Sequence, residues 1–554
     1  MLLRTVKKLR FADWILFASL LLVGGFHEYI SCALSAAMSV YLLIRLTGKK
    51  TLTVRRDFLT SAVVAVCLGY GLTCLWAVDR GMALVGFLKF LPLFLYLLCL
   101  QQENAEQSLQ WLPYFGAAMA ILSAIGMQFS AVEALFAVAG RLAGFFQYPN
   151  TFAVFLLVCE LLLLKKPGKR IWDYVTLAIL LGGLLYTGSR TAFLVAIVAN
   201  IAMLLCLTKR NVRTFLWMGL GGVCLLGILL MLGENSVLRR YLTISVTEST
   251  FVGRLLYWAD ALPLLAKYPL GMGYMGYYYT QQSIQTGVYS VMYIHNDFLQ
   301  LVLDIGWVPA GLFFSALVVW FVKKSVPVAD KIILGAVLLH SLFDFDLQFI
   351  GMYLLVLLLL SQDKTEKVMV VKPRLPLKLS FCVVALASLY IGTALMLAHM
   401  GSRQVADALY PYNTQNKLTL LEQTEDLETA NDLADDILKQ NTAFFGPYSI
   451  KAKYCYSKGD FVGLIQNQRA ALERNPFNHT QYEAYCKMLL KGIELYQKAG
   501  DSNSASICKQ ELLAVEKQLE ANAQRLSRLG KMIKDQPVTE LSEAVRAQIR
   551  QLGG

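Results

Sequence analysis

The chain has few charged residues and few histidines. Asp, Glu, Lys and Arg make up only 16% of its 554 residues, and there are five histidines, whereas hydrophobic residues make up 56%. The mean hydropathy is +0.51. So little charge beside so much apolar surface excludes an ordinary soluble globular chain. The composition predicts an all-α, polytopic membrane helix bundle.

The chain also lacks clustered metal ligands and paired thiols. Its eleven cysteines are scattered, eight in hydrophobic stretches and three in the C-terminal tail, with no CxxC pair and no Cys/His cluster. This pattern favours single buried thiols and predicts no metal site. A disulfide among Cys455, Cys486 and Cys508 stays open, provided that the tail lies in an oxidising compartment.

The first apolar run lacks a small-residue cleavage site and is followed by many similar runs. We therefore interpret it as a membrane span rather than a cleavable signal peptide. Apolar runs of about 17 to 25 residues cross a bilayer, and some here are at the short end. We count thirteen, near 14–30, 31–46, 58–77, 83–100, 111–129, 149–164, 172–186, 190–208, 214–232, 298–322, 328–343, 348–361 and 379–398.

Loop charges orient these spans, because Lys and Arg are retained on the cytoplasmic side. With the N-terminus inside, the cytoplasmic groups hold 24 Lys or Arg, whereas the opposite loops before the tail hold seven. The inside loop 101–110 has no basic residue and is the exception. Thirteen crossings then place the C-terminal tail outside, in a multi-pass protein of the cytoplasmic (inner) cell membrane.

The formal net charge of +13 lies entirely in the membrane part. Membrane topology and anionic inner-leaflet lipid account for this excess, so we expect no nucleic-acid partner.

Two domains are expected: a membrane domain over 1–399 and an extracytoplasmic helical domain over 400–554. In the tail, ANDLADDILKQNTAFFGPYSIKAKYCYSKGDFVGLIQNQRAALERNPFN resembles a tetratricopeptide unit. Gly459 and Asp460 supply its turn and Pro476 ends its second helix. Helix pairs of this kind stack on neighbours, expected near 420–440 and 480–525. A plain helical bundle is the alternative. A tetratricopeptide tail could bind a protein partner or an acceptor.

The longest polar segment between apolar runs extends from Gly233 to Gly306, with its catalytic part expected over 233–297. A loop of about 60 residues in such a protein is usually functional. It carries Arg254, a Gly/Tyr-rich turn from Gly271 to Tyr279, and His295 just before the next apolar run.

The expected topology gathers four polar groups on the outer side. They are GRLAGFFQYPNT from Gly140, YTGSRT from Tyr186, the loop stretch around Arg254, and HND from His295. Guanidinium groups bind phosphate oxygens bidentately and stay charged, so Arg141, Arg190 and Arg254 could hold a diphosphate. Interfacial snorkelling or helix capping is the alternative for any one arginine.

His295 could accept a proton from a hydroxyl nucleophile, with Asp297 tuning it. Its alternative is a structural role, capping the helix that follows. His340, Asp344 and Asp346 form a second polar group. At spacing i and i+4, His340 and Asp344 are expected to share a helix face, either as a proton or acceptor site or as a buried structural pair.

These motifs together resemble the bacterial O-antigen ligase and polymerase superfamily of polytopic glycosyltransferases. The resemblance rests on five pieces in order, namely GRLAGFFQYPNT, TGSRTA, GRLLYWADALPLLAKYPLGMGYMGY, YIHNDFLQLVLDIG and HSLFDFDLQF. A soluble tetratricopeptide-like tail also recurs in that superfamily. The resemblance implies an inverting glycosyltransferase that acts on the outer face of the membrane and takes a glycan from a polyprenyl diphosphate such as undecaprenyl diphosphate.

The resemblance also implies roles for individual residues. Arg254 and Arg190 match the arginines that hold the diphosphate, and Arg141 is a third, weaker contact. His295 matches the histidine that orients or deprotonates the acceptor hydroxyl. No cofactor or divalent metal is implied, since arginines neutralise the leaving group. The remaining residues expected in the substrate site are Asn150, Tyr274, Asn296 and Asp297.

The acceptor stays open at this point: a lipid, a cell-surface glycan or a protein would each fit. A repeat-unit polymerase and a protein O-oligosaccharyltransferase share the motifs of a ligase. A polysaccharide or lipid transporter is the alternative of another class, but transporters usually place charged residues near the membrane midplane and show internal repeats. A mere anchor for the tail would need only one span.

Overall fold

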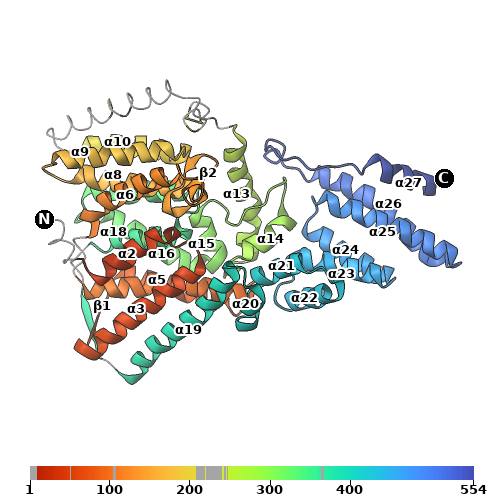
Figure 1. Cartoon of the computed structure of the whole chain (residues 1–554), viewed down its shortest axis with the longest axis horizontal. Coiled ribbons are helices and arrows are strands. Elements are labelled where there is room, and N and C mark those ends of the chain that lie inside the picture. Colours follow the sequence, from red (N-terminus) through yellow and green to blue (C-terminus); the bar gives the residue numbers. More distant parts are fainter. Residues whose placement is uncertain are drawn as a thin grey trace. The chain divides into compact units, whose positions relative to one another are not determined.

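A computed structural model gives the structure of the chain (Figure 1). It describes residues 9–49, 51–103, 108–206, 247–362, 367–372 and 374–553, with residues 219, 222, 237, 240, 241 and 245. Within these residues the regular elements are almost all helices, and the all-α membrane bundle is confirmed. The chain divides into two compact units. The first comprises Met1–Gly71, Val85–Ser245 and His295–Met396, and the second comprises Leu72–Leu84, Val246–Ile294 and Leu397–Gly554.

The apolar runs account for the helices of the membrane part. They are α2 (Phe11–Leu21), α3 (Glu28–Lys49), α4 (Phe58–Thr73), α5 (Arg80–Gln102), α6 (Ser108–Gly126), α8 (Pro149–Lys165), α9 (Ile171–Tyr186), α10 (Arg190–Cys206), α15 (Asp297–Ile305), α16 (Trp307–Val322), α17 (Val328–Ser341), α18 (Ile350–Leu360) and α19 (Leu375–His399). Short elements between them are η1 (Val23–Gly25), α7 (Glu133–Phe136), η2 (Gly144–Phe146), η3 (Asp346–Gln348) and the strands β1 (Leu52–Arg55), β2 (Ala137–Val138), β3 (Arg141–Leu142) and β4 (Val368–Val371).

Twelve of the thirteen expected spans fall on these helices, and the span expected near 214–232 lies outside the described residues apart from 219 and 222. Four helices, α3, α5, α6 and α19, are long and apolar enough to cross a membrane alone, and several shorter apolar helices accompany them. The protein is therefore a multi-pass membrane protein. The span expected near 298–322 is two helices, because Gly306 adopts φ 83 and separates α15 from α16.

Two helices form the centre of the first unit. Every residue of α8 from Thr151 to Leu164 is buried, as is the whole of α18. A helix that is apolar all round belongs inside a bundle. The helices α6, α9, α10 and α17 pack around α8, and α6, α8, α9 and α10 lie side by side in Figure 1. By contrast, α9 and α10 expose large apolar side chains such as Trp172 and Leu205, which suits contact with lipid.

The loops expected in the cytoplasm meet one another. Strands β1 and β4 pair antiparallel, with Leu52 opposite Val371. The Gln102 side chain donates to the Thr53 carbonyl (2.6 Å) and accepts from the Thr53 N–H (3.0 Å). The start of the basic-free loop 101–110 therefore lies on the same side as the basic stretch 45–56. The contacts fix which loops share a side, and the assignment of that side to the cytoplasm stays a prediction from charge.

The second unit contains α13 (Ser249–Lys267) and α14 (Gly276–Ile284) from the long loop, and the tail helices. These are α20 (Arg403–Leu409), α21 (Thr414–Gln423), α22 (Leu427–Gln440), α23 (Gly446–Ser457), α24 (Phe461–Arg474), α25 (His479–Lys498), α26 (Ser502–Gln524) and α27 (Glu543–Gly553). The tail expected from residue 400 lies wholly in this unit, which also takes in most of the long loop.

The helix pair expected in the tail is present. Gly459 has φ 74 between α23 and α24, the Asp460 side chain accepts from the Gly463 N–H (2.9 Å) to begin α24, and α24 ends before Pro476. Its buried face, with Phe461 and Leu464, joins a core shared with α25 and α26. The neighbours therefore stack as expected, and the tetratricopeptide likeness itself stays a prediction. The three tail cysteines are free thiols.

The long loop also contacts the turn between α4 and α5 and the tail. The Val78 N–H donates to the Met272 carbonyl (2.9 Å), and the Asn441 amide donates to the Asp79 carboxylate (3.0 Å). Gly273 (φ 79) permits this approach, since a Cβ there would lie 2.4 Å from Cβ of Ala77. Loop and tail thus share one side of the membrane, as four spans between them require.

Candidate functional site

His295 occupies a constrained position just before α15. Its backbone is left-handed, with φ 54, a region that residues other than glycine rarely adopt. The next residue, Asn296, begins the helix, because its side chain accepts from the N–H groups of Phe298 (3.1 Å) and Leu299 (3.0 Å). The capping role considered for His295 thus belongs to Asn296. Strained backbone of this kind is found preferentially at functional sites.

The carboxylate beside His295 is Asp344. Nδ1 of His295 lies 3.3 Å from Oδ1 of Asp344, and the imidazole meets the Phe345 ring edge-on, with centroids 4.9 Å apart. Asp344 is fully buried, whereas the His295 side chain keeps 20% of its exposure. The expected tuning residue, Asp297, instead accepts the backbone N–H of Leu347 (2.8 Å). The interpretation of Asp297 as the partner is therefore corrected to Asp344.

The expected pairing of His340 with Asp344 on one helix face is wrong. Helix α17 ends at Ser341, so Asp344 lies in the following turn and no longer follows the helical spacing. His340 pairs with Asp346 instead, with Nδ1 and Oδ2 2.6 Å apart and both side chains fully buried. The other oxygen of Asp346 accepts from the Thr151 hydroxyl (2.8 Å). This second pair joins α17 to α8 and is a buried structural contact.

Asp344 is the centre of a hydrogen-bond chain. Its carboxylate accepts from the Tyr148 hydroxyl (2.8 Å) and the Asn150 amide (2.8 Å). The carbonyl of that amide accepts from Arg141 Nη2 (2.7 Å), and Arg141 Nε donates to the Thr187 carbonyl (2.7 Å). The chain thus links HND, HSLFDFD, GRLAGFFQYPN and TGSR, four motifs that are far apart in sequence.

A cluster of arginines surrounds the Thr187-Gly188 turn. A Cβ on Gly188 (φ 60) would lie 3.5 Å from both Arg141 Nε and Arg240 Cδ, so both side chains lie against this turn. Burial, and then the charge of Arg240, lowers the pKa of Arg141 to about 10. Arg190 begins α10 two residues after the turn. A region that holds like charges together at a helix N-terminus suits an anion.

In the sequence, Arg240 stands out only as one of the seven basic residues of the expected outer loops. It follows Arg239 in a loop without a motif, so spacing alone offered no signal for it. Tyr148 likewise stood inside a quoted motif without a role.

Arg254 and Tyr274 belong to the second unit. Arg254 lies in the second turn of α13. Burial raises the pKa of Tyr257, and the charge of Arg254 offsets part of that rise. Tyr274 is 1% exposed, and its hydroxyl lies 3.0 Å from that of Tyr293. The Tyr274 hydroxyl therefore helps to hold the turn that precedes α14.

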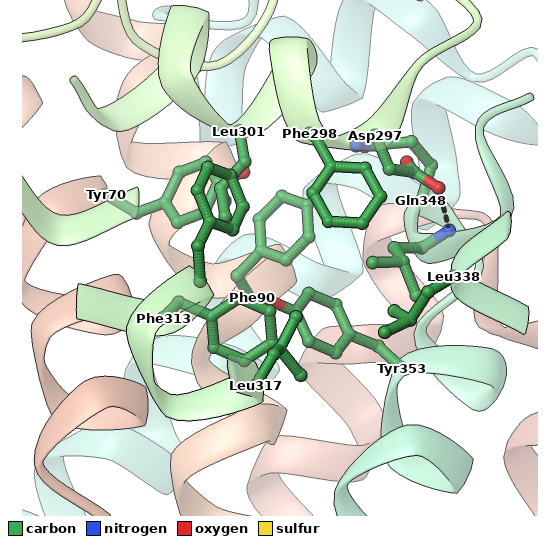
Figure 2. Close-up of a pocket in the computed structure, with 12 residues that line it drawn as sticks. Tyr70, Phe90, Asp297, Phe298, Leu301, Phe313, Leu317, Leu338, Gln348 and Tyr353 are labelled. Atoms are coloured by element: carbon green, nitrogen blue, oxygen red, sulfur yellow. Dashed lines mark hydrogen bonds between the residues drawn. The ribbon is translucent and has the colours of Figure 1, made fainter. Parts of the chain in front are cut away.

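A small cavity lies beneath the segment of His295 in the first unit. Figure 2 shows the rings of Phe90, Phe298 and Tyr353 facing one another, with Asp297 and Gln348 together at one edge. The cavity has a volume of about 10 Å³, roughly the limit for one water molecule. A sugar would not fit, so the cavity is not the substrate site.

Among the residues that the structure describes, no three or more His, Cys, Asp or Glu side chains gather so that they could hold a metal ion.

The comparison with known families bears on the same residues. Residues 175–314 match the family model described as O-antigen ligase. The matched stretch contains Arg190, Arg254 and His295. None of the curated proteins matches this chain. The chain is thus similar to O-antigen ligases over this stretch, which supports a glycosyltransferase-like ligase or polymerase activity in general.

Proposed function

We propose that this protein transfers a glycan from a polyprenyl diphosphate to an acceptor hydroxyl at the outer face of the cytoplasmic membrane, as an O-antigen ligase does. The observation that carries the proposal is the contact between His295, which lies in the segment similar to the ligase family, and Asp344, which follows that segment. A partly exposed imidazole oriented by a buried carboxylate is the arrangement that a general base requires.

The proton balance follows from this contact. Because Asp344 accepts at Nδ1, the neutral imidazole of His295 carries its proton there and has its lone pair on Nε2. Nε2 takes the proton of the acceptor hydroxyl while the oxygen attacks the anomeric carbon. The bond from that carbon to the diphosphate oxygen breaks, and the polyprenyl diphosphate leaves. Attack opposite the leaving group inverts the anomeric centre.

Arginines stabilise the charge that develops on the diphosphate. Arg254 and Arg190 bind its oxygens, as the family resemblance implies. Arg141 uses two of its N–H groups within the protein, so it contributes mainly charge and holds Asn150 in place. Arg240 adds a fourth cation beside the Gly188 turn. Guanidinium groups can neutralise a diphosphate leaving group without a divalent ion.

The other expected site residues support this arrangement. Asn150 orients Asp344, Asn296 fixes the start of α15, and Asp297 holds the backbone at Leu347, while Tyr274 holds the turn before α14 in the second unit. The N-terminus is cytoplasmic and the tail extracytoplasmic, where the tetratricopeptide-like helices can bind a protein partner.

An in vitro transfer assay tests the proposal. Purified full-length protein is incubated with a polyprenyl-diphosphate oligosaccharide and one acceptor at a time: a lipid, a second lipid-linked oligosaccharide, or a peptide. We expect transfer by the wild type and by the exposed control variant Lys439→Ala, with His295→Ala and Arg254→Ala inactive. The acceptor that is used separates ligase, polymerase and protein glycosylation. Transfer that survives both site substitutions would overturn the assignment.

A further inference from the structure

The end of the tail folds back onto the long loop within the second unit. We call residues 525–536, which follow α26, the brace. Arg525 Nη2 donates to the Ser283 carbonyl (3.0 Å), and the Ser527 N–H donates to the Thr286 carbonyl (3.0 Å). The Lys534 N–H donates to the Ser249 hydroxyl (2.8 Å) at the first residue of α13. These bonds join parts of the chain that are more than 240 residues apart in sequence.

Apolar contacts reinforce these hydrogen bonds. Ile533 of the brace packs with Val252 and Leu256 of α13, and all three are buried. Tyr257, Tyr289 and Leu529 cover this cluster. Val252 and Leu256 are four residues apart and therefore lie on the same face of α13. The brace thus seals one face of this helix.

Two glycines allow the brace to approach the loop closely. A Cβ on Gly530 would lie 2.0 Å from the Thr286 carbonyl oxygen, and a Cβ on Gly287 would lie 2.7 Å from Cα of Gly530. Side chains at either position would push the two backbones apart. The contact therefore depends on the sequence of both segments.

Arg254 and Trp258 lie on the other face of α13. Arg254 is two residues from both Val252 and Leu256, about 200° around the helix from each. Trp258, one turn after Arg254, donates its indole N–H to the carbonyl of Ile294 (3.2 Å), the residue before His295. The brace covers the face of α13 that carries Val252 and Leu256. The opposite face carries Arg254 and contacts the segment that leads to His295.

Asp260 strengthens the same assembly. Its buried carboxylate accepts from the Thr286 N–H (2.9 Å), the Thr286 hydroxyl (2.6 Å) and the Tyr289 hydroxyl (3.0 Å). Thr286 is thereby bound to α13 through its N–H and hydroxyl and to the brace through its carbonyl. The helix, the loop and the brace are one hydrogen-bonded unit.

We propose that the brace is a positioning element of the transferase, which sets the place and orientation of Arg254 for the diphosphate donor. Gly530 and Ile533 are its positioning residues. The inference rests on the proposed function, and it gives the tail a part in catalysis beyond any partner binding. Loosening the brace should weaken donor binding and leave the general base, His295, unaffected.

The experiment uses full-length protein with Gly530→Ala and the milder Ile533→Ala, and with Lys531→Ala as the control, because Lys531 is exposed in the same segment. Hydrogen exchange over 249–290 reports the position of α13, and exchange over 479–493 reports the fold of the tail. A polyprenyl diphosphate titration gives the donor Kd, and transfer assays give donor KM and kcat.

We expect both brace variants to exchange faster over 249–290 but not over 479–493, with donor Kd and KM raised about tenfold or more and kcat changed less. If exchange over 249–290 is unchanged, the brace does not hold α13. If exchange is faster but the donor Kd stays at the wild-type value, the brace does not position Arg254 for the donor. A disulfide between Ser249→Cys and Lys534→Cys should restore donor binding to Ile533→Ala. Failure of the proposed function is separate, because it appears as a wild type that neither binds the donor nor transfers glycan.

Discussion

Nδ1 of His295 and Oδ1 of Asp344 lie 3.3 Å apart, although the two residues are 49 positions apart in the chain. Asp344 is held by the Tyr148 hydroxyl and the Asn150 amide, so its carboxylate cannot turn without breaking those bonds. The left-handed backbone of His295 aims the imidazole from the other side. Both partners are therefore preorganised before substrate binds, which is how an acid–base pair avoids reorganisation during the reaction.

Replacing Asp344 with Asn should lower kcat strongly. The amide keeps the size of the side chain but loses the negative charge that stabilises a protonated His295 and fixes its tautomer. General acid–base catalysis contributes about 10²- to 10⁴-fold, and we expect a loss within this range with donor KM little changed. Steady-state glycan transfer measures both quantities.

Asp330→Asn is the matched control. Asp330 pairs with Lys165, away from the contacts of Asp344, so losing the charge of Asp330 should leave kcat unchanged. Equal kcat values for wild type and Asp344→Asn would remove Asp344 from the mechanism.

The helices could be predicted from sequence because each depends on one contiguous apolar run. The partner of His295 could not. Helical spacing placed Asp344 beside His340, but α17 ends at Ser341 and the turn that follows sends Asp344 to another element. Which carboxylate contacts His295 depends on how α8, α17 and the residues before α15 pack within the first unit. Spacing carries no information of that kind, and only proximity in sequence favours Asp297.

The arginines show the same limit. Charge counting placed Arg141, Arg190 and Arg240 on one side of the membrane, but a common side is not a common site. The approach of Arg141 and Arg240 depends on Gly188, whose positive φ turns the chain between α9 and α10. Motif matching identified Arg141 and Arg190 because their neighbours are distinctive, and it passed over Arg240, whose neighbours are not.

His340→Gln should destabilise the protein without a specific loss of catalysis. His340 is buried against Asp346, and this carboxylate also accepts from Thr151. The substitution leaves the buried Asp346 carboxylate without a full set of hydrogen bonds, which lowers the free energy of unfolding by about 1–3 kcal/mol or more. We expect a lower thermal midpoint in detergent and near-normal kcat per folded molecule. A variant with wild-type stability but abolished transfer would give His340 a direct catalytic role instead.

Arg141 and Asn150 should be energetically coupled. Arg141→Lys keeps the charge but cannot reproduce the fork that reaches both Asn150 and Thr187. Asn150→Ala removes the link between Arg141 and Asp344 in the same chain. Each substitution breaks the same contact between Arg141 and Asn150. The double variant should therefore lose less stability than the summed losses of the two single variants, with a coupling energy of about 0.5–3 kcal/mol. Additive free energies of unfolding would show that the two residues act independently.

Arg240→Gln should weaken donor binding through charge. Removing a cation beside Arg141 lowers the positive potential at the Gly188 turn, where we place the diphosphate. A charged hydrogen bond contributes about 1.5–3 kcal/mol, which corresponds to roughly a 10- to 100-fold rise in the Kd for polyprenyl diphosphate. Titrations at low and high salt should show a smaller difference at high salt, because ions screen exposed charges. Lys324→Gln, an exposed change in an expected cytoplasmic loop, should bind as the wild type does. An unaltered Kd for Arg240→Gln would exclude it from the donor site.

The contacts between loops also predict the outcome of a topology experiment. Strand β1 pairs with β4, and Gln102 contacts β1, so 52–55, 101–102 and 368–371 share one side. Their neighbourhood is rich in Lys and Arg, which the positive-inside bias assigns to the cytoplasm.

In intact cells, with the native reactive thiols replaced, a membrane-impermeant maleimide should label Lys531→Cys in the brace but label Arg56→Cys only after permeabilisation. Labelling of both in intact cells would refute the odd number of spans expected between β1 and the tail. Labelling of Arg56→Cys alone would mean that the membrane orientation is the reverse of the expected one. The proposed site would then lie in the cytoplasm, contrary to the prediction from loop charge.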